Sequence, residues 1–294
     1  MSRIAYVNGR YVPHRHATVH VEDRGYQFSD GVYEVCEVMG ACLIDERRHV
    51  ARLARSLSEL SMDMPMTQAA LGVVLHETVR RNRVRDGIVY IQITRGVAPR
   101  DHAFPARPTR PALVVTARSV DPARTEQLAS DGIAVVTMPD QRWARVDIKS
   151  VSLLPNVLAK QAAREQGARE AWLVDRDGYV TEGASSNAWI VSKDGKLVTR
   201  PIGHDILRGI TRTVLLDVLA AQGLQLDERA FTVEEAYAAR EAFITSATQT
   251  VMPVVLIDGR PVGNGAPGLI AGALRRAYHQ FAASSEARLP EFPY

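Results

Sequence analysis

Lysine is rare in this chain, and one lysine lies where an amine could do chemistry. Only four of the 36 basic residues are lysines, and arginine takes nearly every other cationic position. A desolvated lysine can lose its proton and attack a carbonyl carbon, which arginine almost never does. Lys149 lies in residues 146–150, an alternating run that predicts a strand. From this pattern alone, Lys149 is either a nucleophile or a strand-end lysine whose ammonium group extends to water.

Two segments of small residues could bind a phosphate group. Gly209, Ile210 and Thr211 open a predicted helix, and the first N–H groups of a helix have no partner within it and point toward an anion. Ala247 lies in a second such turn, after a predicted strand. The alternative for Thr211 is an ordinary helix N-cap. The sequence has no glycine-rich P-loop and no dinucleotide fingerprint.

Glu182 is a candidate for holding a ring nitrogen in its protonated form. It ends a predicted strand, and the small and hydroxyl residues 183–187 that follow let a flat ligand approach closely. A carboxylate beside a ring nitrogen favours the protonated, charged ring. From the residues alone, a glutamate that merely flanks a turn explains the pattern equally well.

Arg100 and His102 form a candidate anion site in a loop after another predicted strand. Two residues apart in an extended loop, their side chains project to the same side. Together they could bind a carboxylate by charge-assisted hydrogen bonds. An exposed loop pair without a ligand is the alternative. The eight histidines show no zinc-like spacing, so no metal site is predicted.

These residues must be positioned by a mixture of strands and helices. Alternating apolar residues around Asn8-Gly9 predict a hairpin, and Thr232 with Glu235 predicts a helix capping box. Hairpins followed by helices and then mixed elements indicate an α+β protein. We predict a domain over residues 1–118, a polar linker over 119–130 and a domain over 131–294. Strands are predicted at 32–44 (turning at Gly40-Ala41), 88–94, 112–116, 133–137 and 243–245, and helices at 49–60, 67–82, 156–166, 210–221 and 269–281.

The composition limits the possible partners. The chain is 46% hydrophobic and its net charge is +3, with arginines mixed among nearly as many acids, so a nucleic-acid-binding module has only the arginine content in its favour. Cys36 and Cys42 make no disulfide framework, and no signal peptide or membrane-length apolar stretch is visible. We therefore expect a cytoplasmic protein with no membrane or nucleic-acid partner.

Taken together, the motifs resemble fold type IV pyridoxal-phosphate enzymes, and within these class IV aminotransferases the D-amino-acid transaminases. The resemblance spans nearly the whole chain and rests on motifs that follow one another in order. These are residues 23–35 (DRGYQFSDGVYEV), 94–102 (TRGVAPRDH), 147–150 (DIKS), 181–187 (TEGASSN) and 206–212 (ILRGITR).

The resemblance implies a fold, a cofactor and roles for the candidate residues. The fold would have a smaller N-terminal α/β sandwich and a larger C-terminal pseudo-barrel domain. Lys149 would form the internal aldimine with pyridoxal 5'-phosphate and move the proton, and Glu182 would pair with the ring nitrogen. The other cofactor-binding residues implied are Arg52, Ile210, Thr211 and Ala247 for the phosphate, Leu207 against the ring face, and Ser185 as a support.

The resemblance also implies the substrate. Tyr33, Arg100 and His102 match the trap for the α-carboxylate of a D-amino acid, and Val35 would line the side-chain pocket. The Arg100 loop would reach across from a second subunit, which implies a homodimer with its active site at the subunit interface. The chain departs from the pattern at Ala247, where a threonine is common, and modestly at Ser29 and Ala184.

The predicted function is a transaminase that moves an amino group, by ping-pong kinetics, between a D-amino acid (such as D-alanine or D-glutamate) and a 2-oxo acid. The alternatives of the same fold are an (R)-amine transaminase, a branched-chain amino-acid transaminase and an aminodeoxychorismate lyase. Each would use the same cofactor, so only the substrate and the fate of the amino group separate them.

Overall fold

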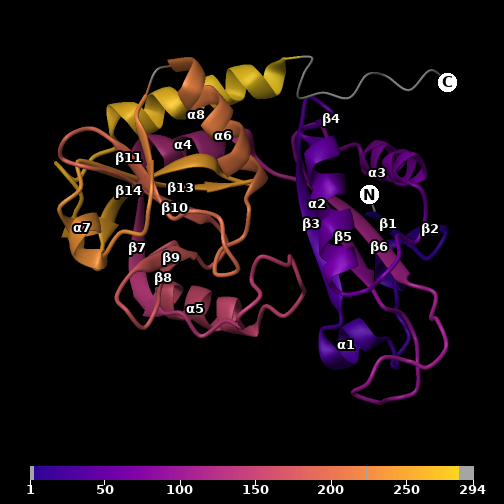
Figure 1. The fold of residues 1–294 in the computed structure, drawn as a ribbon. Helices are drawn as coiled ribbons and strands as arrows, with labels where there is room; N and C mark the ends of the chain where they lie inside the picture. Colours follow the sequence, from indigo (N-terminus) through magenta and orange to yellow (C-terminus); the bar gives the residue numbers. More distant parts are fainter. Residues whose placement is uncertain (1–2, 223, 285–294) are drawn as a thin grey trace. The chain divides into compact units, whose positions relative to one another are not determined.

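The computed structural model describes residues 3–222 and 224–284, which form two compact units. The first unit comprises residues 3–122 together with Ile148–Ser152, and the second comprises Ala123–Asp147 and Leu153–Ala283 (Figure 1). The chain therefore leaves the second unit after Asp147, contributes the short Lys149 segment to the first unit, and returns.

The first unit is built on an antiparallel sheet with strand order β2-β1-β6-β5-β3-β4. Its first hairpin turns at Asn8 and Gly9, whose φ angles of 47° and 95° are typical of a type I′ turn. The predicted hairpin is thus confirmed, as is the strand pair that turns at Gly40 and Ala41. The strands are β1 (Ile4–Val7), β2 (Arg10–Pro13), β3 (Gly31–Met39), β4 (Cys42–Leu43), β5 (Gly87–Thr94) and β6 (Ala112–Ser119).

Two helices pack on this sheet. α2 (Glu46–Glu59) lies on β3, and α3 (Gln68–Asn82) lies on β1 and β6. Both helices were predicted, and Leu53 of α2 and Leu75 of α3 are buried in one core with the strands. α2 begins one turn earlier than the predicted start at His49. The short elements η1 (His14–His16) and α1 (Arg24–Phe28) precede β3.

Buried and partly buried side chains alternate along β3. Val32, Glu34 and Cys36 are buried on one side, whereas Tyr33 and Val35 are only partly buried. Successive side chains of a strand point to opposite faces of its sheet. Glu34 contacts α2, so Tyr33 and Val35 project from the opposite face.

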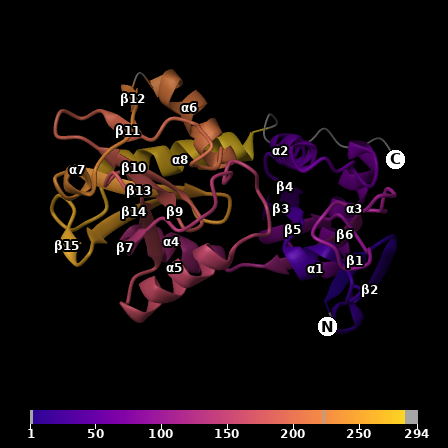
Figure 2. The same cartoon turned by 60° about the horizontal axis from the view of Figure 1, so that its bottom comes forward.

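The second unit is built on a mixed sheet that curls toward a half-barrel. Its strand order is β12-β11-β10-β13-β14-β7-β8-β9, with β15 paired to β14. β9, at one end of this order, also contacts β10 (Figure 2), so the sheet bends back on itself, as the predicted pseudo-barrel requires. The strands are β7 (Ile133–Pro139), β8 (Glu170–Val174), β9 (Val180–Gly183), β10 (Asn187–Val191), β11 (Leu197–Thr199), β12 (Leu226–Glu228), β13 (Glu241–Ser246), β14 (Thr250–Ile257) and β15 (Arg260–Pro261).

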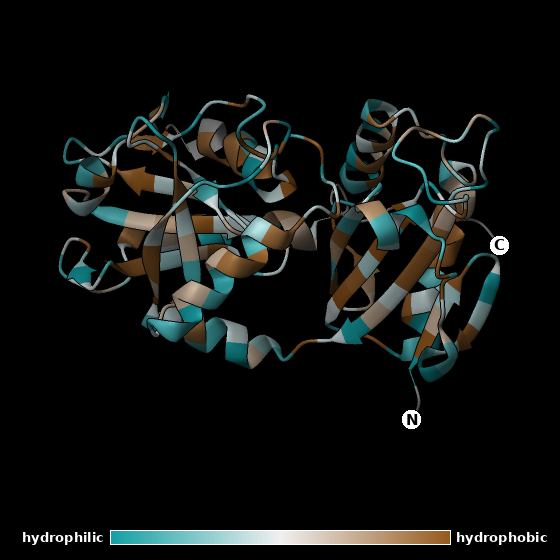
Figure 3. Cartoon of the chain, turned by 90° about the horizontal axis from the view of Figure 1, so that it is seen from below, coloured by the Kyte–Doolittle hydropathy of each residue, from teal (hydrophilic) through white to brown (hydrophobic). Residues whose placement is uncertain are grey.

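Helices pack on this second sheet and bury its strands. α5 packs on β7 and β8, and α6 and α8 pack on each other and on β13. In Figure 3 the strands of each unit carry many hydrophobic residues (brown), and the connecting loops are largely hydrophilic (teal). The predicted capping box is confirmed, because Thr232 and Glu235 each bond the other's backbone N–H. The helices are α4 (Pro122–Asp131), α5 (Leu154–Glu165), α6 (Ile210–Gln222), α7 (Val233–Tyr237) and α8 (Leu269–Ala283).

The strand predicted over residues 146–150 is wrong. Val146 and Asp147 are in a turn, Ile148 and Lys149 are not in a strand, and Ser150 makes an isolated bridge to Val32. Ile148 is buried in the core of the first unit, so the segment is held by one apolar side chain and a few backbone bonds rather than by a ladder. Alternating apolar and polar residues can thus occur in an irregular segment packed on a sheet as well as in a strand.

The segment predicted to be a linker has regular structure. β6 continues through Ser119, and α4 begins at Pro122 with Ala129 buried. The two units part after Pro122, within this segment. Gly223, which follows the helix predicted over residues 210–221, lies outside the described residues. Among the helices of residues 3–222 and 224–284, none combines the length and apolar character needed to cross a bilayer.

Candidate active site

Lys149 is held against β3 by its backbone. Its carbonyl accepts a hydrogen bond from the Tyr33 N–H (2.9 Å), and its own N–H donates to Ser56 Oγ (3.3 Å). The Lys149 Nζ atom lies 4.1 Å from the centre of the Tyr33 ring, where the ring face attracts a cation. The structure therefore brings together two predicted site residues, the lysine and the tyrosine.

Arg52 lies one turn before Ser56 on α2, and it pairs with the buried Glu34. Arg52 Nε and Nη2 donate to the two carboxylate oxygens of Glu34 (2.7 and 2.8 Å), and His49 Nδ1 lies 2.8 Å from Glu34 Oε2. Burial alone would raise the pKa of Glu34, but the charge and hydrogen bonds of Arg52 and His49 hold it well below its ordinary value. The guanidinium plane of Arg52 is thus fixed by a charge-assisted fork.

Two tyrosine side chains, one from β3 and one from β5, lie on the sheet face opposite α2. The Tyr33 and Tyr90 rings are stacked at 5.7 Å with an interplanar angle of 28°, and Val35 is the register partner of Tyr90. The Tyr90 hydroxyl donates to Gln92 Oε1 (2.8 Å). Burial, with a smaller effect of Tyr33, raises the pKa of Tyr90 to about 12, so this phenol stays neutral at physiological pH.

Arg100 and His102 lie in an exposed loop between β5 and β6. Their described ring contacts are with Phe28 of α1: the Arg100 guanidinium carbon is 4.6 Å from the Phe28 ring centre, and the His102 ring centre is 5.4 Å from it. Arg24 donates to the carbonyls of Asp101 (2.6 Å) and His102 (3.4 Å). The two predicted carboxylate ligands are therefore brought together.

The motif at residues 23–35 anchors this loop. Asp23 caps α1 through the Gly25 N–H (2.9 Å) and accepts from the Thr94 hydroxyl (2.9 Å). Asp30 accepts from Arg24 Nε (2.8 Å) and from Arg95 Nε (2.7 Å). The motif thus ties α1 to the end of β5, from which the Arg100 loop departs.

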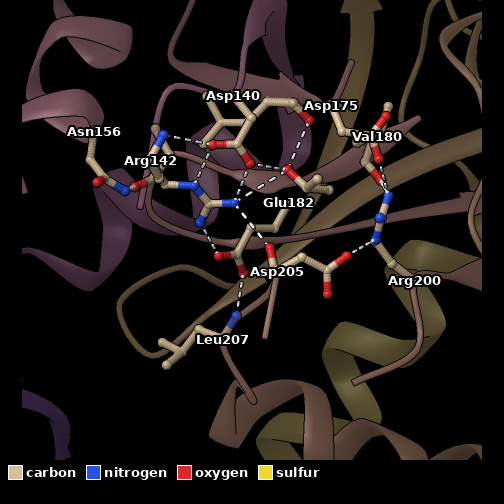
Figure 4. A network of polar contacts seen from close by, with 12 residues as sticks. Asp140, Arg142, Asn156, Asp175, Val180, Glu182, Arg200, Asp205 and Leu207 are labelled. Atoms are coloured by element: carbon tan, nitrogen blue, oxygen red, sulfur yellow. Dashed lines mark hydrogen bonds and ion pairs between the residues drawn. The ribbon is translucent and has the colours of Figure 1, made fainter. Parts of the chain in front are cut away.

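In the second unit, Glu182 lies next to the last residue of β9 and is surrounded by hydrogen-bond donors (Figure 4). Its Oε2 atom accepts from Asn187 Nδ2 (2.9 Å) and from the Leu207 N–H (3.1 Å), and its Oε1 atom accepts from Arg142 Nη1. The Leu207 carbonyl accepts from Asn187 Nδ2 (2.9 Å). A buried carboxylate with these donors is favoured in its ionised form.

Arg142 is itself held by Asp140. Arg142 Nε and Nη2 donate to the two Asp140 oxygens (2.9 and 2.7 Å), and the Thr181 hydroxyl donates to the same carboxylate (2.8 Å). Burial would raise the pKa of Asp140, but the hydrogen bonds and charge of Arg142 lower it. A pocket of about 350 Å³ adjoins these groups, lined also by Trp143 and Asp205.

The loop after Glu182 is fixed from behind by Glu170. The hydroxyls of Ser185 and Ser186 donate to Glu170 Oε2 (2.7 and 3.1 Å), and Lys160 Nζ is 3.2 Å from Oε1. Glu170 is buried at the start of β8. The Ser185 hydroxyl is therefore held by this carboxylate, and its role toward the cofactor stays a prediction.

The two turns predicted to bind phosphate lie at the start of α6 and between β13 and β14. Ile210 begins α6 and Thr211 is buried. At Gly209 an added Cβ would lie 2.1 Å from Asn187 Oδ1, so only glycine permits this close approach. Ala247 lies in the turn between β13 and β14, which Arg275 supports by donating to Thr250 Oγ1 (2.6 Å).

Several residues that position the predicted site residues were not predicted from the sequence. They are buried or half-buried, and each contacts a predicted site residue or its loop. Arg24, Phe28, Glu34 and Asn187 lie within the motifs, but only their contacts in the folded chain show which residues they position. These positioning residues are Arg24, Phe28, Glu34, His49, Asp140, Arg142, Glu170 and Asn187.

Comparison with known proteins identifies the family. Residues 31–257 match the family described as amino-transferase class IV. The chain belongs to this family. As a class IV aminotransferase it is 42% identical to the D-alanine aminotransferase of Bacillus licheniformis, over 96% of this chain and 98% of that one. It is 39% identical to the D-alanine aminotransferase of Staphylococcus haemolyticus, over 94% and 96%.

Solved structures of branched-chain aminotransferases share the fold. The branched-chain amino acid aminotransferase of Escherichia coli superimposes with a TM-score of 0.88 at 22% identity, covering 99% of this chain and 98% of that one. The branched-chain enzyme of the archaeon Thermoproteus uzoniensis, solved with norvaline, gives a TM-score of 0.84 at 27% identity, covering 96% and 95%. Another branched-chain enzyme, solved with pyridoxamine 5'-phosphate, gives a TM-score of 0.87 at 26% identity, covering 98% and 97%. The predicted α+β fold type IV architecture is thereby confirmed.

Proposed function

We propose that this class IV aminotransferase moves the amino group between a D-amino acid and a 2-oxo acid with pyridoxal 5'-phosphate as cofactor. The observation that carries the proposal is the fixed pair of Arg100 and His102, which Phe28 and Arg24 hold together in one loop. Two neighbouring groups able to carry positive charge suit one carboxylate. The similarity to D-alanine aminotransferases at 42% and 39% identity supports the same substrate class.

The residues present fit the cofactor. Glu182 is held in place to receive a protonated ring nitrogen, and Leu207, whose backbone bonds to Glu182, would pack on the ring. Gly209 lets the backbone lie close to Asn187 just before α6. At the start of this helix, Ile210 and Thr211 would bind phosphate oxygens. Arg52 and the Ala247 backbone would add a charge and a donor, and Ser185 would support the Glu182 loop.

Each protein group has a distinct task in the reaction. When bound, pyridoxal phosphate supplies an electron sink for the substrate. The Lys149 amine would hold the cofactor aldehyde and would move a proton at the substrate Cα. Glu182 would keep the ring nitrogen protonated.

The stereochemistry follows from where the α-carboxylate is held. Tyr33, Arg100 and His102 would bind the carboxylate on one side, and the side chain would then lie toward Val35. In this orientation Lys149 meets the α-hydrogen of the D-isomer. The Arg100 loop would come from a second copy of the chain, so the active form would be a homodimer, acting in the cytoplasm.

A branched-chain transaminase is the second candidate, because the structural neighbours carry that name. Their identities are 22%, 26% and 27%, well below those of the D-alanine aminotransferases. An (R)-amine transaminase would not need the carboxylate pair, and an aminodeoxychorismate lyase would release pyruvate without an amino acceptor.

The test is a comparison of stereoisomers. Purified enzyme is incubated with D-alanine or with L-alanine, each with and without 2-oxoglutarate, and pyruvate is measured. We expect pyruvate only with D-alanine plus 2-oxoglutarate. Activity with L-alanine and none with D-alanine would contradict the substrate class. Catalytic release of pyruvate without the acceptor from D-serine, which can lose water across Cα and Cβ, would indicate a lyase; D-alanine has no leaving group on Cβ and cannot react in this way.

A further inference from the structure

Phe28 is a common support for the two carboxylate ligands. Its ring centre lies 4.6 Å from the Arg100 guanidinium carbon, 5.4 Å from the His102 ring centre and 4.7 Å from the Arg24 guanidinium carbon. An aromatic face attracts a guanidinium group. The exposed Arg100 and His102 side chains therefore pack against the same ring.

Arg24 fixes the backbone of the same loop. It is almost fully buried, and it donates to the carbonyls of Asp101 (2.6 Å) and His102 (3.4 Å) while Asp30 accepts from its Nε atom (2.8 Å). The Asp30 carboxylate pairs with Arg24 and also accepts from Arg95 Nε (2.7 Å). Two guanidinium groups, those of Arg24 and Arg100, therefore lie near the Phe28 ring.

We propose that Phe28 and Arg24 are positioning residues that set the spacing of Arg100 and His102 for an α-carboxylate. The inference rests on the proposed function, because it assigns that carboxylate to the substrate. Exposed long side chains lose conformational freedom on binding a ligand, and holding them beforehand removes part of that loss. The effect of this support therefore falls on carboxylate binding and leaves cofactor chemistry unchanged.

The principal variant is Phe28→Leu, which keeps an apolar side chain and removes the aromatic face. With D-alanine and 2-oxoglutarate we expect the Michaelis constant for D-alanine to rise about tenfold. The turnover number and the affinity for pyridoxal phosphate remain within about twofold. Tyr26→Leu is the matched control, because Tyr26 lies on the same helix and its side chain is 77% exposed; it should leave both constants unchanged.

A double-mutant cycle separates positioning from a general structural role. In an enzyme that already carries Arg100→Leu and His102→Ala, Phe28→Leu should raise the Michaelis constant no further. An equal rise in both backgrounds would show that Phe28 does not act through the two ligands and would overturn the inference. If Phe28→Leu does not fold, as judged by circular dichroism, Arg24→Lys is carried through the same cycle with the same two criteria.

The cycle also distinguishes this inference from the proposed function. If Arg100→Leu alone leaves the Michaelis constant for D-alanine unchanged, the carboxylate trap itself is wrong. If Arg100→Leu raises that constant and neither Phe28→Leu nor Arg24→Lys does, the trap stands and the positioning role is wrong.

Discussion

Each unit of this enzyme contains a buried arginine paired with a glutamate. The proposed ligand-binding member is the arginine in one pair and the glutamate in the other. In the first unit, Glu34 is enclosed and Arg52 is the proposed phosphate ligand. In the second unit, Arg142 is the holder and Glu182 is the proposed partner of the cofactor ring. The same ion pair thus presents a cation in one unit and an anion in the other.

The two pairs differ in how the partner of the ligand-binding residue is supported. Glu34 pairs with Arg52 and with His49, both from helix α2. Arg142 is fixed by Asp140, whose carboxylate also accepts from Thr181. A buried ion pair is weak evidence for stability, because desolvation offsets the attraction. We infer that both pairs serve to position a ligand-binding group, so removing the ligand-binding member should cost more function than removing its holder.

The largest effect is expected in the second unit. Glu182→Gln removes the charge that keeps the cofactor ring nitrogen protonated, and we expect the turnover number with D-alanine to fall about 100- to 1000-fold. Arg142→Met, which removes only the holder, should lower it about tenfold. Steady-state kinetics at saturating pyridoxal phosphate measure both. A larger loss in Arg142→Met than in Glu182→Gln would reverse the assigned roles.

In the first unit the effect should fall on cofactor affinity. Arg52→Met removes a charge-assisted phosphate contact, and we expect the dissociation constant of pyridoxal phosphate to rise about 100-fold. Glu34→Gln should raise it about tenfold, with turnover at saturating cofactor unchanged. Fluorescence titration of the apoenzyme gives these constants.

Glu77→Gln is the control for this second comparison. Glu77 also accepts from arginines, Arg80 (2.6 Å) and Arg81 (2.6 Å), but on the surface of α3. Its replacement should not alter cofactor affinity. Equal affinities in Arg52→Met and the wild type would remove Arg52 from the phosphate site.

The smallest effect is on stability in acid. The pKa of Glu34 is depressed in the folded protein, so its ionic contribution is present above its ordinary value of 4.5 and is lost as the pH falls toward the folded value. The difference in free energy of unfolding between the wild-type apoenzyme and Glu34→Gln should be constant near pH 7 and shrink below about pH 4.5. Urea titrations at several pH values measure it, and a difference that grows in acid would contradict the assignment.

Local features of the fold could be predicted from the sequence, and contacts between distant residues could not. The Asn8-Gly9 hairpin and the Thr232 capping box depend on neighbouring residues, and both are confirmed. The pairs that position the site join residues 18 apart (Glu34 and Arg52) and 40 apart (Arg142 and Glu182). Nothing in the spacing of such residues indicates that the folded chain will bring them together.

The Lys149 segment shows why periodicity alone can mislead. Its alternating residues predict a strand, but its buried apolar side chain, Ile148, and the bridge of Ser150 hold it as an irregular segment on β3. The motif resemblance, in contrast, correctly predicted the aminotransferase family before any contact was known. Motifs carry chemical information that periodicity does not.

The measurement that tests the account most directly is the location of the covalent bond to the cofactor. The holoenzyme is reduced with borohydride, digested and analysed by mass spectrometry. With only four lysines in the chain, the result is unambiguous. We predict the phosphopyridoxyl group on Lys149, and its loss, together with nearly all turnover, in Lys149→Ala. A stoichiometric label on Lys160, Lys193 or Lys196, or turnover at the wild-type level in Lys149→Ala, would contradict the account.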